Sequence, residues 1–139
     1  MSLDHDFKVS AENYLKAFLD LEAQTNTNHL PNKDLSKHLK VTRASVSQMV
    51  KKLAQQGYVR MSRERGYSLS PKGRRRAKEL LRAHIPVEMF LEDTLGLSGP
   101  FLHKEAEKME HAVSVKLVNK IDEFLGQPEK DYMGEKIPR

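Results

Sequence analysis

The stretch between residues 42 and 69 limits the fold of this chain more than any other part. Thr42 is a predicted N-cap, and apolar residues then recur at helical spacing as far as Gln56, where Gly57 ends the pattern. A shorter helical pattern lies before Thr42, and a brief turn separates the two helices. Beyond Gly57 apolar and polar residues alternate on both sides of a turn at 63–65, which is typical of a β-hairpin. Two helices followed by a hairpin predict a winged helix-turn-helix.

Helical spacing extends over most of the remaining chain, so the predicted fold class is mainly α. The expected helices, besides the one after Thr42, cover residues 10–24, 31–40, 71–91, 101–112 and 114–125. Ser10 is the expected N-cap of the first helix, after a polar lead-in. Pro86 predicts a kink or break near Ala83 and His84. An N-terminal winged helix over residues 1–73 is therefore expected before an all-helical domain over 74–139, with an extended tail after 126.

Composition excludes several classes of protein. The chain has 139 residues and no cysteine, so disulfide frameworks and cysteine-ligated zinc sites are ruled out. No apolar run approaches the ~18 residues of a membrane span, and the first ten residues lack a signal-peptide core. The sequence also lacks a glycine-rich phosphate loop and any evident arrangement of catalytic residues. We therefore expect a soluble, cytoplasmic protein that is not an enzyme.

Charge is strongly segregated along the chain. The net charge is +5, but residues 36–82 contain fourteen Lys and Arg and only two acids, a net charge of +12. The remainder carries a net charge of −7. A basic block of this kind predicts a polyanionic partner, and an acidic block suits a cation or a partner protein.

The helix after Thr42 has the composition of a DNA-recognition helix. Its first turns offer side chains that read base edges, and its later lysines, with the arginines of the hairpin turn, suit phosphates. The predicted DNA-binding residues are Thr42, Arg43, Ser45, Ser47, Gln48, Lys51, Lys52, Arg63 and Arg65, with Lys72, Arg74 and Arg75 as additional phosphate contacts. The alternative is a winged-helix module that binds another protein.

A candidate metal site lies in the stretch 103–111. In a helix, His103, Glu107, Glu110 and His111 occupy positions i, i+4, i+7 and i+8 on one face. Imidazoles and carboxylates are suitable ligands for a divalent first-row metal. The alternative is an ordinary charged helix face, because lysines and a further glutamate surround these residues.

Taken together, these motifs resemble the diphtheria toxin repressor family of metal-dependent transcriptional regulators. The resemblance rests on the segment VTRASVSQMVKKL from Val41, on GYSLSPKG from Gly66, on Ala83-His84 and on HKEAEKMEH from His103. It covers nearly the whole chain, from the ENYL segment to GEKIP near the end. It is closest to the manganese transport regulator type that lacks the SH3-like third domain, so two domains are expected.

The resemblance implies two metal sites. Carried over by position, a principal site uses Asn13, Glu107, Glu110 and His111, and an ancillary site uses His84, Glu88 and His103. A ligand set without sulfur favours Mn(II), with Fe(II) or Zn(II) as alternatives. Asn13 stands where manganese regulators of the family have Asp, and Lys16 where two-metal clusters have Glu. Because a protonated Lys repels cations, separate sites are expected instead of a binuclear cluster.

The resemblance further implies a metal-dependent repressor that controls metal homeostasis. Such a protein is expected to be a homodimer that binds a palindromic operator in double-stranded DNA, without a membrane or a small organic ligand. Apolar residues of the last two helices that suit a dimer interface are Met109, Val113, Leu117, Val118, Ile121 and Phe124. Two alternatives remain: a winged-helix regulator or interaction module that does not use metal, and a multiple-antibiotic-resistance-type regulator that senses an organic ligand.

Overall fold

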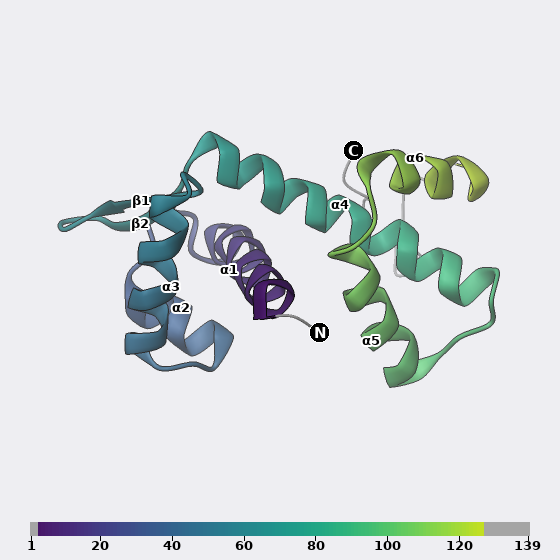
Figure 1. Cartoon of the computed structure of the whole chain (residues 1–139), viewed down its shortest axis with the longest axis horizontal. Helices are drawn as coiled ribbons and strands as arrows, with labels where there is room; N and C mark the ends of the chain where they lie inside the picture. Colours follow the sequence, from purple (N-terminus) through teal and green to yellow (C-terminus); the bar gives the residue numbers. More distant parts are fainter. Residues whose placement is uncertain (1–2, 127–139) are drawn as a thin grey trace. The chain divides into compact units, whose positions relative to one another are not determined.

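The computed structural model describes residues 3–126 and divides the chain into two units, Met1–Lys78 and Glu79–Arg139 (Figure 1). The first unit contains α1 (Leu3–Thr25), α2 (Asn32–Leu39), α3 (Arg43–Gln55), β1 (Val59–Ser62) and β2 (Gly66–Leu69). The second contains α5 (Gly99–Glu110) and α6 (Val115–Phe124), and α4 (Pro71–Asp93) contributes residues to both. The winged helix-turn-helix followed by helices confirms the predicted fold class. The expected domain boundary after residue 73 stays a prediction.

The first unit is organised around the apolar face of α1. Leu15 and Phe18 of this helix are fully buried against Leu35 of α2 and against Val46 and Val50 of α3. The N-cap of α3 has the predicted form, because the Thr42 hydroxyl accepts a hydrogen bond from the Ser45 N–H at 3.0 Å. The packing fixes α3 from one side and leaves its opposite face in solvent.

The wing is an antiparallel pair with an additional bridge on its outer edge. Val59 pairs with Leu69 and Arg60 with Ser68, so successive pairs alternate between the core and solvent. Leu30 forms an isolated bridge with Tyr67, with both N–H···O distances at 2.8 Å. The loop between α1 and α2 is thereby hydrogen-bonded to β2, which holds this side of the wing in place.

Gly66 permits the close approach of the α1–α2 loop, and we expect Gly66→Ala to destabilise the first unit. Gly66 has φ +101°, and a Cβ there would lie 2.5 Å from the Leu30 carbonyl oxygen. Backbone strain of this kind costs about 1–3 kcal/mol, and the clash adds to it. Chemical denaturation would measure the loss. The matched control is Gly96→Ala, where φ is +74° but no atom of the described residues lies within 4 Å of the added Cβ. Equal losses of stability in both variants would contradict the proposed clash.

The second unit has a smaller core, to which α4, α5 and α6 each contribute. Val87 and Leu91 of α4 pack with Leu102 and Ala106 of α5 and with Ile121 of α6. Of the kink or break predicted near Ala83 and His84, the break is wrong, because α4 continues through Pro86 to Asp93, and the kink stays a prediction. Pro86 is buried, as are its neighbours Ala83 and Val87, so packing on both sides of the proline compensates for the lost backbone hydrogen bond.

Two other boundaries differ from the expectation. The first helix begins at Leu3 and not at Ser10, because Phe7 continues the apolar face of Ala11 and Tyr14 by one turn and packs on the core. Helix α5 ends at Glu110, which leaves His111 as its C-cap. The predicted extended tail lies outside the described residues, apart from Gly126. No helix in the described range 3–126 has the length and apolar character that a membrane crossing requires.

Candidate functional site

The solvent-facing side of α3 presents most of the predicted base-reading residues. Arg43, Ser45, Ser47 and Gln48 are all exposed, while Val46 between them is buried. Within the part of the chain that the structure describes, the side chains of Arg43 and Gln48 make no hydrogen bond or ion pair. These two residues are therefore available to a partner, and each can bond a base edge bidentately.

The other polar residues of this face are engaged in hydrogen bonds within the protein. The Thr42 hydroxyl donates to the Ser45 hydroxyl at 2.9 Å, besides capping the helix. The Asn32 amide group at the start of α2 donates to the Ser47 hydroxyl at 2.9 Å and to the Arg43 carbonyl oxygen at 3.1 Å. Local sequence patterns do not indicate this role of Asn32. Its bonds fix the start of α3 relative to α2, so its role is to position the recognition helix.

The predicted phosphate contacts fall into two groups. Lys51 is exposed and has no ion-pair partner among residues 3–126, whereas the Lys52 ammonium lies 5.2 Å from the centroid of the Phe7 ring. Lys72 donates to the Gln56 carbonyl oxygen at 2.9 Å and lies over the Tyr58 ring. Lys52 and Lys72 therefore also contribute to the packing of the first unit.

Arg74 is held by the partly buried carboxylate of Glu22 and is the least available of the predicted phosphate contacts. Its two terminal nitrogens bond the two oxygens of Glu22 at 2.9 and 2.7 Å. This hydrogen-bonded pairing raises the pKa of Arg74 above its ordinary value. A second ion pair joins Arg76 to the buried Glu12. Both pairs fasten the start of α4 to α1, so their role is structural.

The wing turn keeps its arginines in solvent. Arg63 and Arg65 are exposed on either side of Glu64, and the Arg65 N–H donates to the Ser62 hydroxyl at 3.2 Å. Neither guanidinium forms an ion pair within the described part of the chain. The wing and the exposed face of α3 therefore offer four cations that no residue within 3–126 compensates, Arg43, Lys51, Arg63 and Arg65. This is the electrostatic character that a phosphate backbone requires.

A cluster of potential metal ligands lies in the second unit. One ligand atom from each of His84, Glu88 and His103 lies within 4.8 Å of the other two. His84 and Glu88 are one turn apart on α4, and the His84 Nε2 lies 2.8 Å from a Glu88 oxygen. His103 comes from α5, and its ring meets that of His84 edge-on at 5.9 Å between centroids. The structure thus brings together the three residues of the expected ancillary site.

The other predicted ligands are distributed differently. Glu110 is almost fully buried, and one of its oxygens lies 3.1 Å from the His84 Nδ1. His111 is also buried, whereas Glu107 is exposed and pairs with His103 at 2.9 Å. Among the described residues these three do not form a cluster like that around His84. Asn13 is exposed on α1 in the first unit, and its place in a principal site stays a prediction.

The donor set of the His84 cluster fits a divalent ion. Two ligands bound to one ion at ~2.1 Å in a tetrahedral arrangement lie about 3.4 Å apart, so side-chain shifts of roughly an ångström would close the cluster. The His84 ring is already oriented, because Glu110 holds Nδ1 while Nε2 faces Glu88. Metal-binding histidines commonly have such an outer carboxylate partner. Imidazole and carboxylate donors without sulfur suit manganese, iron(II) and zinc.

Comparison with known proteins gives two family matches that together span most of the chain. Residues 6–67 match the family described as "Iron dependent repressor, N-terminal DNA binding domain". Residues 70–139 match "Iron dependent repressor, metal binding and dimerisation domain". The first match covers the winged helix with its exposed basic residues, and the second covers the ligand cluster.

Individual relatives include proteins named for iron and for manganese. An uncharacterised helix-turn-helix-type transcriptional regulator of Methanocaldococcus jannaschii is 33% identical over 84% of this chain and 92% of its own length. The iron-dependent repressor IdeR of Mycobacterium leprae is 29% identical over 96% of this chain and 57% of its own. The structure of the manganese regulator SloR matches with a TM-score of 0.77 and 35% identity, over 93% of this chain and 59% of its own. This chain therefore spans little more than half the length of the latter two.

Proposed function

This chain belongs to the diphtheria toxin repressor family of iron-dependent repressors, and from that premise we propose that it is a metal-activated repressor of transcription. The observation that carries the proposal is the cluster of His84, Glu88 and His103 in a chain whose other unit presents an exposed basic recognition helix. The relatives are named as regulators and repressors, not as enzymes. We expect the protein to act in the cytoplasm.

We infer that the metal is manganese. The ligands of the cluster are two imidazoles and a carboxylate, and the chain has no cysteine to provide sulfur. The SloR structure, a manganese regulator, supports this choice. When bound, the ion supplies positive charge that links α4 to α5 through His84, Glu88 and His103. Glu107, Glu110 and His111, with Asn13, remain the predicted ligands of a principal site, as the resemblance implies.

The proposed DNA contacts divide into two roles. Arg43 and Gln48 read base edges, because their side chains are exposed and available on α3. Lys51, Arg63 and Arg65 contact phosphates, and Lys52 assists from its place beside Phe7. Thr42, Ser45 and Ser47 reach the backbone of the duplex while keeping the hydrogen bonds that shape the start of α3.

We infer that the repressor is a homodimer and that α6 contributes to its interface. Leu117 and Phe124 are seven residues apart on one face of α6, and they are 45% and 67% exposed. Val115 and, on α5, Phe101 are also large and exposed. By contrast, Val118 and Ile121 are buried within the unit, so these two members of the predicted interface are core residues. A dimer of winged helices matches a palindrome whose half-sites are about one helical turn apart.

The direct test is operator binding with and without metal. A DNA selection with the full chain and Mn(II) should yield a palindromic duplex that binds two chains. Chelation should weaken this binding by about five- to 150-fold, the usual range of coupling between two ligand sites. Fluorescence anisotropy and analytical ultracentrifugation would measure affinity and stoichiometry. Equal affinity in both conditions would leave a regulator that does not use metal, and no duplex binding at all would favour a protein-interaction module.

A further inference from the structure

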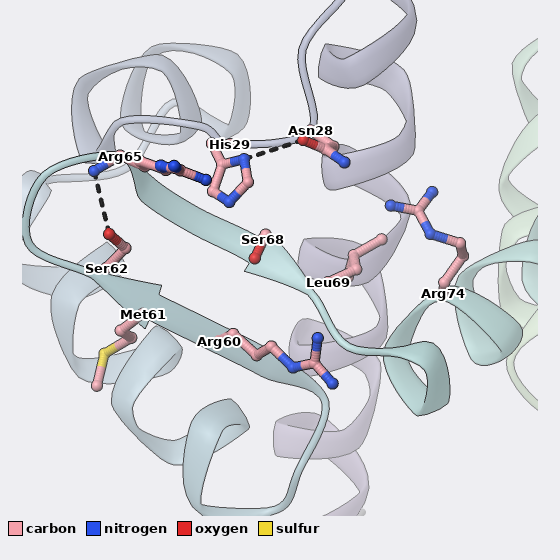
Figure 2. A pocket seen from close by; sticks show the side chains of 9 residues that line it. All are labelled: Asn28, His29, Arg60, Met61, Ser62, Arg65, Ser68, Leu69 and Arg74. Carbon is pink, nitrogen blue, oxygen red and sulfur yellow. Dashed lines mark hydrogen bonds between the residues drawn. The ribbon is translucent and has the colours of Figure 1, made fainter.

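A pocket of about 400 Å³ lies beside the wing in the first unit (Figure 2). Its floor includes Arg60 and Ser68, which are cross-strand partners and therefore share one face of the hairpin. His29 from the α1–α2 loop lies along one side, and Arg65 from the wing turn lies near it. The metal cluster and the recognition helix contribute no residue to this lining.

The electrostatic character of the pocket is strongly positive. Three arginines and a histidine line it, and no Asp or Glu in the described part of the chain does. Arg74 is neutralised by its contact with Glu22. Arg60 and Arg65, by contrast, have no ion-pair partner among the residues that the structure describes. Two guanidinium groups therefore line the same pocket, Arg65 beside His29 and Arg60 on β1 (Figure 2), and no described residue provides a counter-charge for them.

The remaining polar groups of the pocket are suitable donors for an anion. The hydroxyls of Ser62 and Ser68 line it, and the His29 Nδ1 lies 2.9 Å from the Asn28 side-chain oxygen. With Nδ1 directed to Asn28, a protonated His29 can donate from Nε2 to a ligand. The bridge between Leu30 and Tyr67 holds the loop against β2, so His29 and Ser68 are positioned before any ligand binds.

We propose that this pocket binds a phosphate group. Guanidinium groups bond phosphate oxygens bidentately, and the hydroxyl and imidazole donors add bonds from other directions, which suits a tetrahedral anion. The group can come from the backbone of the operator or from free phosphate. The backbone is the favoured source, because Arg65 belongs both to this pocket and to the wing turn. That assignment rests on the proposed DNA binding, whereas binding of free phosphate does not.

The first experiment measures the affinity of the variant Arg60→Gln for the selected duplex. Arg60 is exposed, so the substitution should preserve the fold, and it removes one cation from the pocket. We expect a several-fold lower affinity for the selected duplex and a salt dependence, the slope of log K against log salt, that is shallower by about 1. The matched control is Lys8→Gln, which removes the same charge from an exposed position on α1 outside the pocket.

The second experiment titrates the full chain with inorganic phosphate in the absence of DNA, at constant ionic strength set by chloride. Amide NMR shifts at His29 and Ser68 that saturate in the wild type and disappear in Arg60→Gln would support the site. If only the duplex experiment shows an effect of Arg60→Gln, the phosphate group in the pocket comes from the DNA backbone. If only the phosphate titration shows saturating shifts, the ligand is the free ion. If Arg60→Gln matches Lys8→Gln on DNA and phosphate produces no saturating shifts, the proposal is overturned.

The two proposals can fail separately. A wild-type chain that binds no duplex removes the proposed repressor function, and the phosphate titration then decides the pocket by itself. If the wild-type chain binds its operator with metal, while Arg60→Gln matches Lys8→Gln on the duplex and phosphate produces no saturating shifts, only the pocket proposal is removed.

Discussion

The double variant Lys51→Glu with Lys52→Glu is expected to lose operator binding, with an affinity roughly a hundredfold lower or more. Each substitution removes a cation from the exposed side of α3 and places an anion there, so attraction to phosphate becomes repulsion. The slope of log K against log salt should become shallower by about 2, because two phosphate contacts are lost. Anisotropy titrations at several salt concentrations, with Mn(II) present, would measure both quantities.

The two lysines are not equivalent, and this determines the controls. Lys52 lies over the Phe7 ring, so its substitution also removes a contact between α3 and α1. The single variant Lys51→Glu avoids that loss and should retain the unfolding midpoint of the wild type. Lys8→Glu with Lys78→Glu changes the net charge equally at exposed positions on α1 and α4. If this control weakens binding as much as the α3 variant, the effect is general electrostatics and α3 is not the recognition helix.

His84→Ala should have the largest effect on metal binding. The His84 imidazole touches Glu88 through Nε2 and Glu110 through Nδ1, and it faces the His103 ring. Removing only an outer partner of a metal ligand typically costs 10–100-fold in affinity. Loss of the imidazole itself should therefore lower the affinity for Mn(II) by about 100-fold or more. Isothermal titration calorimetry of the metal-free protein would measure it.

The control for His84 is a histidine that also pairs with a carboxylate but lies in the other unit. His38 on α2 lies 3.7 Å from an Asp20 oxygen, and His38→Ala should leave Mn(II) binding unchanged. His84→Ala also removes the imidazole that contacts the buried Glu110 carboxylate, and this loss can destabilise the fold. Thermal unfolding of the metal-free variant must therefore accompany the titration. Glu88→Gln, which keeps the size of the side chain, provides a second test. Wild-type affinity and stoichiometry in both variants would disprove the site.

Much of the first unit could be predicted because local signals and burial agree there. Thr42 and Gly57 mark the ends of α3, and the buried faces of α3 and of the wing follow from spacing and alternation alone. The sequence prediction placed the start of α1 seven residues late, because five of the nine residues before Ser10 are polar and the packing of Phe7 on the core is a tertiary contact. For Pro86 a local rule predicted a kink or a break, and packing around the proline keeps the helix continuous, which excludes the break.

In the candidate sites, too, local spacing predicts some contacts and tertiary packing decides the others. Helical spacing placed His103 and Glu107 on one face, and the two residues do pair. Spacing could not show that His84, one turn from Glu88 on α4, also reaches Glu110, because that second contact depends on how α4 and α5 pack. In the first unit, alternation indicates that Arg60 is exposed, but only the register of the hairpin pairs it with Ser68. Likewise, only the bridge to β2 positions His29.

By itself, the sequence determined the order of the helices and strands, the segregation of basic and acidic segments, and the chemical types of the metal ligands. These properties are local, since they depend on spacing within one element and on side-chain chemistry. Tertiary structure decided which charged groups are available. It engaged Arg74 with Glu22 and left Arg60 and Arg65 without a counter-charge among the described residues. It also buried Glu110 beside His84 while leaving Glu107 in solvent. Availability depends on residues that are distant in the sequence, which no local pattern records.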